Sequence, residues 1–355
     1  MRIAHRVVGD AHPAIHGLRT FEKLLVGHDT GMNLREYESW GLKISTVLWL
    51  ILVLASAAVA GRAYAADVPY VPTPANVVDT MLNLGKVGPD DYLIDLGSGD
   101  GRIVIAAAQR FGTRGFGVDI DGALVSEAQR EAQKQGVADK VAFYARNLFV
   151  TDISKASVVT MYLLPQVNLR LRPRLFTELK PGTRVVSHDF DMDSWKPDDR
   201  VTVPVPDKPY GEPKSEVYLW IIPANAAGTW RWRLGAGAAA RDYEVVLEQT
   251  FQILSGRATV GAQPAQLGNA RMRGEAIEFA LVARIDGRDV RHEFSGRVSG
   301  DAITGTVAVR VAPSQRLEWN ATRVARGKMT IEASARSVPD FVPAHTLRKI
   351  YIAQE

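Results

Sequence analysis

Three glycines and two aspartates carry the strongest chemical signal in this sequence. The run Asp95-Leu96-Gly97-Ser98-Gly99-Asp100-Gly101 stands between a predicted strand and a predicted helix, and Asp119 ends the next predicted strand. Backbone N–H groups at a helix N-terminus bind ligand groups at close range, and glycine leaves no Cβ to block the approach. The third glycine comes one residue earlier than in the dinucleotide fingerprint. Because the carboxylate of Asp95 would repel a pyrophosphate, the pattern favours a nucleotide that carries a positive charge.

The second aspartate of this pattern has a role of its own. Asp119 is placed to accept hydrogen bonds from ribose hydroxyls, as acidic residues do in other nucleotide-binding βαβ units. Each feature also has a structural alternative, which is a tight turn for the glycine run and an ordinary helix cap for Asp119.

The elements that must position these residues alternate between strands and helices. Strands are predicted at residues 92–96, 115–120, 141–145, 157–163 and 183–188, and helices around 77–82 and at 103–110, 123–135 and 167–179. Two further strands, near 201–205 and 217–222, have no helix between them and indicate an antiparallel hairpin at one sheet edge. This order predicts an α/β fold with a doubly wound, mostly parallel, seven-stranded Rossmann-like sheet.

A second pattern begins near residue 228. Short apolar or alternating stretches at 243–249, 257–260, 276–285, 292–298, 302–311 and 317–322 are separated by glycine turns. They predict a smaller antiparallel all-β domain, either a barrel or a sandwich. We therefore expect domains at 67–226 and 227–325, with a C-terminal tail at 326–355.

Three polar residues at strand ends are candidates for the site of the acceptor. Tyr162 follows the fourth strand, and His188 and Asp189 follow the fifth. Open α/β sheets bind ligands at the carboxyl ends of their strands, so these side chains are predicted to be catalytic or to form the acceptor wall. A packed tyrosine and a turn aspartate are the structural alternatives.

The acid, the glycine loop and the second acid together resemble the class I S-adenosylmethionine (SAM)-dependent methyltransferases over about residues 69–223. Pro69-Tyr70-Val71-Pro72, the run from Asp95 to Arg102, and Val185-Val186-Ser187 before Trp195 are similar to the lysine methyltransferases of the ATP synthase c-subunit and adenine nucleotide translocase group. The resemblance implies SAM as cofactor and a methyl acceptor that includes protein lysine among the candidates. The aspartate after the second strand, where relatives have glutamate, and the β-rich addition are departures, and the addition leaves the acceptor open.

The resemblance also implies which residues bind the cofactor. They are Tyr70, Thr73, Asp95, Leu96, Gly97, Ser98, Gly99, Gly101, Asp119, Ile120, Asn147 and Leu148. Asp95 and the first two glycines would hold the methionine part, Asp119 the ribose, and Asn147 with Leu148 the adenine. Tyr70 and Thr73 would close over the cofactor. A turn-forming asparagine and a proline-stiffened linker are the alternatives for Asn147 and for the Tyr70 segment.

Composition narrows the chemistry further. The chain has no cysteine, which excludes thiolate metal sites and a cysteine nucleophile, and no metal site is predicted. The net charge of +4 is scattered rather than gathered in a basic stripe. The sequence Met161-Tyr162-Leu163-Leu164-Pro165 also lacks the Asn/Asp-Pro-Pro-Tyr signature of base methyltransferases. We therefore expect no nucleic-acid partner.

An apolar run at Ile44–Ala60 predicts a link to the membrane. Basic residues precede it and an A-x-A site follows it, so residues 44–66 are typical of a signal peptide or an uncleaved membrane anchor. Residues 1–43 form an N-terminal extension, and Met32 is a candidate start. The predicted location is the cell envelope, either exported to the periplasm or anchored by this segment. The flanking charges place the catalytic domain outside, whereas SAM is made inside cells, and this conflict stays open.

Two other functions are compatible with the same residues. A non-catalytic protein of the cell envelope could combine a degenerate SAM fold with a β-domain that holds an apolar ligand. Trp230, Trp232 and Trp319 would then line a cavity, although packing in the core of a small barrel is the simpler role for tryptophan. A dinucleotide oxidoreductase is the third hypothesis, and the glycine spacing opposes it.

Overall fold

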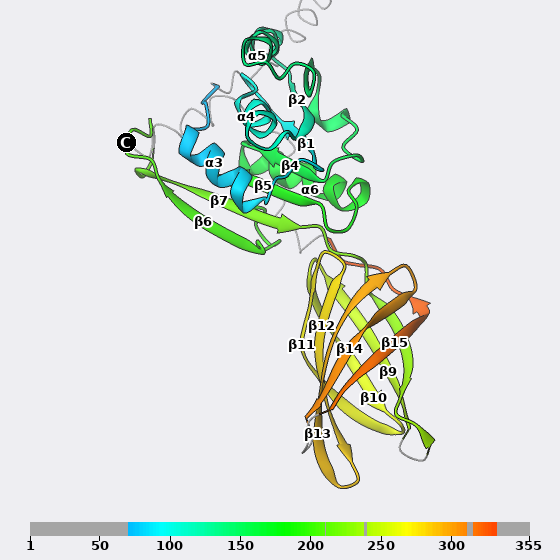
Figure 1. The fold of residues 1–355 in the computed structure, drawn as a ribbon. Helices are drawn as coiled ribbons and strands as arrows, with labels where there is room; N and C mark the ends of the chain where they lie inside the picture. The colour runs from blue at the N-terminus through cyan, green and yellow to red at the C-terminus, as the bar shows by residue number, and fades with distance from the viewer. Residues whose placement is uncertain (1–69, 210, 238–239, 311–314, 332–355) are drawn as a thin grey trace, which may run out of the picture. The chain divides into compact units, whose positions relative to one another are not determined.

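A mixed sheet of seven described strands forms the first part of the fold (Figure 1). The computed structural model describes residues 70–209, 211–237, 240–310 and 315–331. The strands are β1 (Tyr92–Leu96), β2 (Arg114–Asp119), β3 (Val141–Ala145), β4 (Val158–Met161), β5 (Arg184–His188), β6 (Asp199–Pro204) and β7 (Lys214–Ile221). They lie in the order β3-β2-β1-β4-β5-β7-β6, with β1 to β5 parallel and β7 antiparallel to both of its neighbours. The predicted α/β fold and the antiparallel hairpin at the edge are confirmed.

Helices cover both faces of this sheet. Their bounds are α3 (Ala75–Leu84), α4 (Arg102–Phe111), α5 (Gly122–Lys134) and α6 (Pro165–Glu178), with a short 3₁₀ turn, η2, at Leu148–Val150. Apolar residues of α3, α4 and α5 share one core with Leu93 of β1, whereas those of α6 share a second core with Ile94 and Leu96. Because side chains alternate along a strand, one short strand supplies both cores. The apolar positions predicted for the first helix, Val77, Val78, Met81 and Leu82, are all buried.

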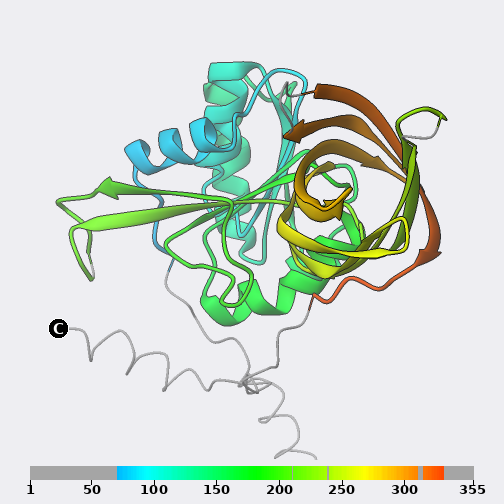
Figure 2. The same cartoon turned by 90° about the horizontal axis from the view of Figure 1, so that it is seen from below.

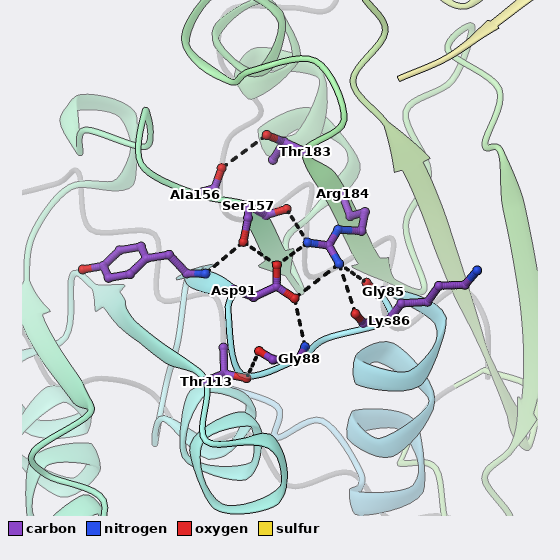
Figure 3. Close-up of polar contacts among 10 residues, drawn as sticks. Gly85, Lys86, Gly88, Asp91, Thr113, Ala156, Ser157, Thr183 and Arg184 are labelled. Atoms are coloured by element: carbon purple, nitrogen blue, oxygen red, sulfur yellow. Dashed lines mark hydrogen bonds and ion pairs between the residues drawn. The ribbon is translucent and has the colours of Figure 1, made fainter. Parts of the chain in front are cut away.

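A polar network lies at the amino ends of the parallel strands (Figure 3). The Asp91 carboxylate accepts hydrogen bonds from Arg184, from the Ser157 hydroxyl at 2.7 Å and from the Gly88 N–H at 2.9 Å. Burial alone would raise the pKa of Asp91, but these hydrogen bonds hold it below its ordinary value. The Thr113 hydroxyl donates to the Gly88 carbonyl at 2.8 Å. These contacts join three loops at the end of the sheet opposite the glycine loop, where the parallel strands begin. The network is therefore structural.

Eight described strands after the sheet form a closed antiparallel barrel, which Figure 2 shows nearly end-on. The strands are β8 (Gly228–Leu234), β9 (Arg241–Thr250), β10 (Ile253–Val260), β11 (Gln263–Arg273), β12 (Ala276–Ile285), β13 (Arg288–Ser299), β14 (Ala302–Arg310) and β15 (Gln315–Arg326). Each pairs with its neighbour in sequence, and β15 pairs with β8 to close the ring. The predicted all-β domain is confirmed, and of the two expected architectures it is the barrel.

Aromatic side chains fill the interior of the barrel. Trp230 and Trp319 are about 1% exposed, and their indole N–H groups donate to the Ala226 and Ser295 carbonyls. The Trp232 ring lies 5.2 Å from Tyr243 and 5.1 Å from Trp319, measured between ring centroids. An eight-stranded barrel has room inside for side chains or one small ligand. The three tryptophans belong to the packed core here.

A turn of the barrel also packs against the α/β part. Phe251, between β9 and β10, is 3% exposed and belongs to the core of α6. Its ring lies 5.7 Å from Phe176 and 6.1 Å from Trp195, while the Gln252 amide donates to the Lys196 carbonyl at 2.6 Å. The two parts therefore share buried apolar surface.

The N-terminal membrane prediction falls on residues that are not described. The segment 44–66 and the extension 1–43 both lie outside the described ranges. Within those ranges, no helix is long and apolar enough to cross a membrane.

Candidate active site

The glycine loop follows β1, and three of its residues have left-handed backbone conformations. Gly97, Gly99 and Gly101 have φ values of +79°, +52° and +79°. The N–H groups of Gly97 and Ser98 both donate to the Val118 carbonyl at 2.9 Å, which holds the loop against the end of β2. A side chain at any of the three positions would be strained by its φ value alone. The conformation of the turn alone therefore requires glycine at these positions, independently of ligand binding.

Close neighbours add a second requirement for glycine. A Cβ on Gly97 would come within 2.7 Å of Leu163, and one on Gly99 would come within 2.2 Å of the Tyr70 ring. The Tyr70 hydroxyl also accepts a hydrogen bond from the Asp100 N–H at 3.4 Å. Tyr70 thus lies directly over the glycine loop, where the resemblance implies that it closes over the cofactor.

Asp95, at the end of β1, is a buried carboxylate with one free oxygen. It is 1% exposed, and Oδ1 accepts a hydrogen bond from the Thr160 hydroxyl at 2.8 Å. Oδ2 has no partner among the described residues. Burial is the main cause that raises the pKa of Asp95 to about 7. The Thr160 hydrogen bond lowers this pKa, and the nearby carboxylates of Asp119 and Asp100 raise it further. A buried carboxylate oxygen without a donor is a ready site for a cationic group.

Asp119 accepts hydrogen bonds on both oxygens. Oδ2 receives the Gly99 N–H at 2.9 Å and Oδ1 receives the Asp121 N–H at 3.0 Å. The helix cap of α5 is Asp121, whose side chain accepts from Ala123 and Leu124. Asp119 is therefore not the cap, and it holds the glycine loop next to the end of β2. The adjacent Ile120 is 83% exposed, an apolar surface beside the predicted ribose site.

Asn147 follows β3 and shapes the next turn. Its side-chain oxygen caps η2 by accepting from the Phe149 N–H at 2.9 Å, and Arg146 N–H donates to the Asp119 carbonyl at 2.8 Å. Leu148 is half-buried beside it. These contacts bring the end of β3 beside the end of β2. The adenine role of Asn147 and Leu148 stays a prediction.

Tyr162 and His188 form one wall at the carboxyl ends of β4 and β5. Their ring centroids lie 3.9 Å apart, and the Phe190 ring is nearly parallel to Tyr162 at 6.1 Å. His188 is 1% exposed, with Nδ1 3.2 Å from the Thr73 hydroxyl and Nε2 2.9 Å from the Ser215 hydroxyl. Burial lowers the pKa of His188 to about 4. The wall is therefore aromatic and uncharged at neutral pH.

The Asp189 carboxylate borders this wall at His188, with its Oδ2 3.5 Å from the His188 Nε2. Its Oδ2 is 2.8 Å from the Lys208 Nζ, and its Oδ1 accepts from the Glu216 N–H at 3.1 Å. Its φ of +60° is unusual for a residue other than glycine and sets the turn after β5. An aspartate committed to an ion pair and a backbone N–H is poorly suited to remove a proton from an acceptor. The geometry favours the structural alternative given above for this residue.

Four residues that the sequence analysis did not single out take part in the site. Thr160, Phe190, Lys208 and Ser215 contact Asp95, Tyr162, Asp189 and His188. Thr160 is two residues before Tyr162 and Phe190 is two residues after His188, so proximity to a candidate was the only available signal for these two residues. Among the described residues, no group of three or more His, Asp or Glu could hold a metal ion.

The strand order, with its antiparallel seventh strand, and the glycine loop between two acids define a class I SAM-dependent methyltransferase. Comparison with known proteins agrees. Residues 95–199 match the family model of the ANTKMT methyltransferase domain. A protein-lysine N-methyltransferase of Saccharolobus islandicus is 46% identical over 160 residues, which are 45% of this chain and 96% of that protein. A lysine N-methyltransferase of the ATP synthase c-subunit from Xenopus laevis is 32% identical over 45% of this chain and 72% of its own length.

The chain therefore belongs to the family of methyltransferases that includes these two relatives. It is also 54% identical to a crystal structure titled as an RNA methyltransferase from Salinibacter ruber in complex with S-adenosyl-L-homocysteine. That likeness covers 42% of this chain and 93% of the other, with a TM-score of 0.39. The enzyme uses S-adenosylmethionine, whose sulfonium supplies an electrophilic methyl group.

The described residues fit this cofactor. The free Oδ2 of Asp95 would bind the amino group of the cofactor, and Asp119 would face the ribose. The glycines would let the cofactor come close to the backbone of the loop. Tyr70 would lie over it from the N-terminal side. The roles of individual residues stay predictions.

Proposed function

We propose that this methyltransferase transfers its methyl group to the side-chain amine of a protein lysine. The observation that carries the proposal is the wall of Tyr162, His188 and Phe190, which lies beside the glycine loop. Leu163, next to Tyr162, is the residue that a Cβ on Gly97 would meet. The acceptor wall and the cofactor loop are therefore adjacent.

This wall suits an amine that must react in its neutral form. A lysine ammonium has no lone pair, and an apolar, aromatic surface disfavours the charged form. His188 is itself uncharged at neutral pH, because burial lowers its pKa, so it would neither repel the amine nor stabilise its proton. Once neutral, the amine needs only correct alignment for in-line displacement at the methyl carbon. The Saccharolobus and Xenopus relatives are both named as lysine N-methyltransferases, which supports the same acceptor.

The test offers the full chain two kinds of acceptor. The enzyme is incubated with methyl-labelled SAM and either a mixed protein extract or a mixed RNA preparation, and labelled products are hydrolysed and identified. Methyllysine is expected from the protein sample and is expected to be lost with Gly97→Val, whose side chain would clash with Leu163. Label confined to RNA, or to an amino acid other than lysine, would overturn the proposal.

We also propose that the enzyme acts at the cell envelope. The apolar run Ile44–Ala60 and its flanking residues support an exported or anchored protein. A topology reporter fused after Glu355, combined with membrane fractionation, tests this location. Full recovery in the soluble cytoplasmic fraction would refute it.

A further inference from the structure

We propose that His188 is a positioning residue that fixes the segment Tyr70–Thr73 over the cofactor loop, and that it is not an acid or base for the methyl acceptor. The proposal concerns cofactor binding, so it holds whether or not the acceptor is lysine. It assigns the buried histidine a role that acts through Thr73.

Both ring nitrogens of His188 are already engaged. Nδ1 lies 3.2 Å from the Thr73 hydroxyl, and Nε2 lies 2.9 Å from the Ser215 hydroxyl of β7. All three residues are at most 4% exposed. A neutral imidazole has one donor and one acceptor, and a hydroxyl can serve as either partner. A histidine whose two nitrogens are occupied by buried hydroxyls has none left to accept a proton from the acceptor.

The segment also contacts the first residue of α4 and the glycine loop. The Thr73 carbonyl accepts a hydrogen bond from Arg102 at 2.9 Å, and Arg102 in turn pairs with Asp100 through its Nε at 2.9 Å. The Tyr70 ring lies over Gly99. The segment is thus fixed to β5 by His188 and to the cofactor loop by Arg102 and Tyr70. If the His188 contact is lost, one of these two attachments is lost.

The surroundings of His188 keep it in the form that these contacts need. Burial is the main cause of its low pKa, the Asp189 carboxylate opposes the shift, and the Lys208 ammonium adds to it. The Tyr162 ring covers one face of the imidazole. His188 therefore remains neutral throughout the physiological range and can hold both hydroxyls at once.

The experiment compares Thr73→Val with Thr113→Val in the full chain. Both threonines are buried and each makes a side-chain hydrogen bond, but Thr113 lies at the amino ends of the strands, away from the glycine loop (Figure 3). The dissociation constant of SAM is measured by calorimetry, and the melting temperature by scanning calorimetry. Loss of one buried hydrogen bond predicts that Thr73→Val weakens SAM binding about tenfold, whereas Thr113→Val lowers only the melting temperature.

Two further variants separate positioning from simple structural damage. Thr73→Ser keeps the hydroxyl and is expected to restore binding, while His188→Gln is expected to raise the KM for SAM more than it lowers kcat. Unchanged SAM affinity in Thr73→Val, or equal weakening by Thr113→Val, would overturn the proposal. A large fall in kcat for His188→Gln with normal SAM affinity would show that His188 acts on the acceptor instead.

Discussion

The phenol ring of Tyr162 and the imidazole of His188 lie face to face, with centroids 3.9 Å apart and planes inclined by 32°. The contact joins the end of β4 to the end of β5, next to the point where the sheet order reverses between β1 and β4. Ligands of open α/β sheets bind at such reversal points. Tyr162 is therefore placed where the proposed acceptor would bind, and the His188 ring packs against it.

Replacing Tyr162 should affect turnover more than cofactor binding. Tyr162→Ala removes a ring from the acceptor wall and is expected to lower kcat about a hundredfold, the usual cost of a misplaced acceptor. The SAM dissociation constant should change little, because the glycine loop and Asp95 are untouched. Tyr162→Phe keeps the ring and should keep most of the activity. A comparable loss in Tyr162→Phe would assign the chemistry to the hydroxyl.

Binding of SAM should weaken in acid because of Asp95. Its pKa of about 7 in the free protein means that the carboxylate must lose a proton before it can face the cationic amino group. The groups around it are the Thr160 hydroxyl and the carboxylates of Asp119 and Asp100, which do not supply that positive charge. Calorimetry should show affinity falling about tenfold per pH unit below pH 7. Asp95→Asn should bind weakly and show no such dependence.

The same group predicts a pH effect on folding stability. The folded-state pKa of Asp95 lies above its ordinary value of 3.8, so its favourable contribution is complete below pH 3.8 and is lost as the pH rises towards 7. Asp95→Asn avoids burying a charge and should therefore melt at a higher temperature than the parent at pH 8. Near pH 4 the two proteins should melt alike. A lower melting temperature for the variant at pH 8 would show that a partner stabilises the charged form.

Gly99 and Gly136 offer a matched pair of glycine substitutions. Both have positive φ values, +52° and +68°, but a Cβ at Gly99 would strike the Tyr70 ring whereas none of the atoms around Gly136 lies within 4 Å. Each change to alanine should cost stability by about 1 kcal/mol through backbone strain. Only Gly99→Ala should also weaken SAM binding, because Tyr70 must leave the loop. Equal SAM affinities in the two variants would contradict the placement of Tyr70 over the cofactor.

Phe251 tests whether the barrel stabilises the methyltransferase part. Phe251→Ala removes a buried ring that contacts Phe176 and Trp195, and is expected to lower the free energy of unfolding by about 3 kcal/mol. The neighbouring Ile253 is 59% exposed, so Ile253→Ala should cost well under that amount. Denaturant unfolding followed by tryptophan fluorescence measures both. Equal effects would mean that the contact contributes little to the shared core.

Much of the α/β part can be predicted from the sequence because its signals are local. The strands at β1 and β3 have the predicted bounds, and the helices are displaced by only a few residues. Apolar periodicity and the need for positive φ in a tight turn act within a few residues of the chain. Two barrel strands, β8 and β11, were missed. β11 contains Pro264, Gly268 and a bulge and is largely exposed, so its pattern is weak.

The sequence alone determined the class of fold, the glycine loop and the identity of the cofactor, since each depends on residues that are close in the chain. Tertiary structure decided which of the candidate residues meet. Thr160 reaches Asp95 across 65 residues and Thr73 reaches His188 across 115, and the closure of the barrel depends on pairing β15 with β8. These contacts form only when distant segments pack together, and a side chain's partner and burial, which set its pKa and its role, are properties of that packing.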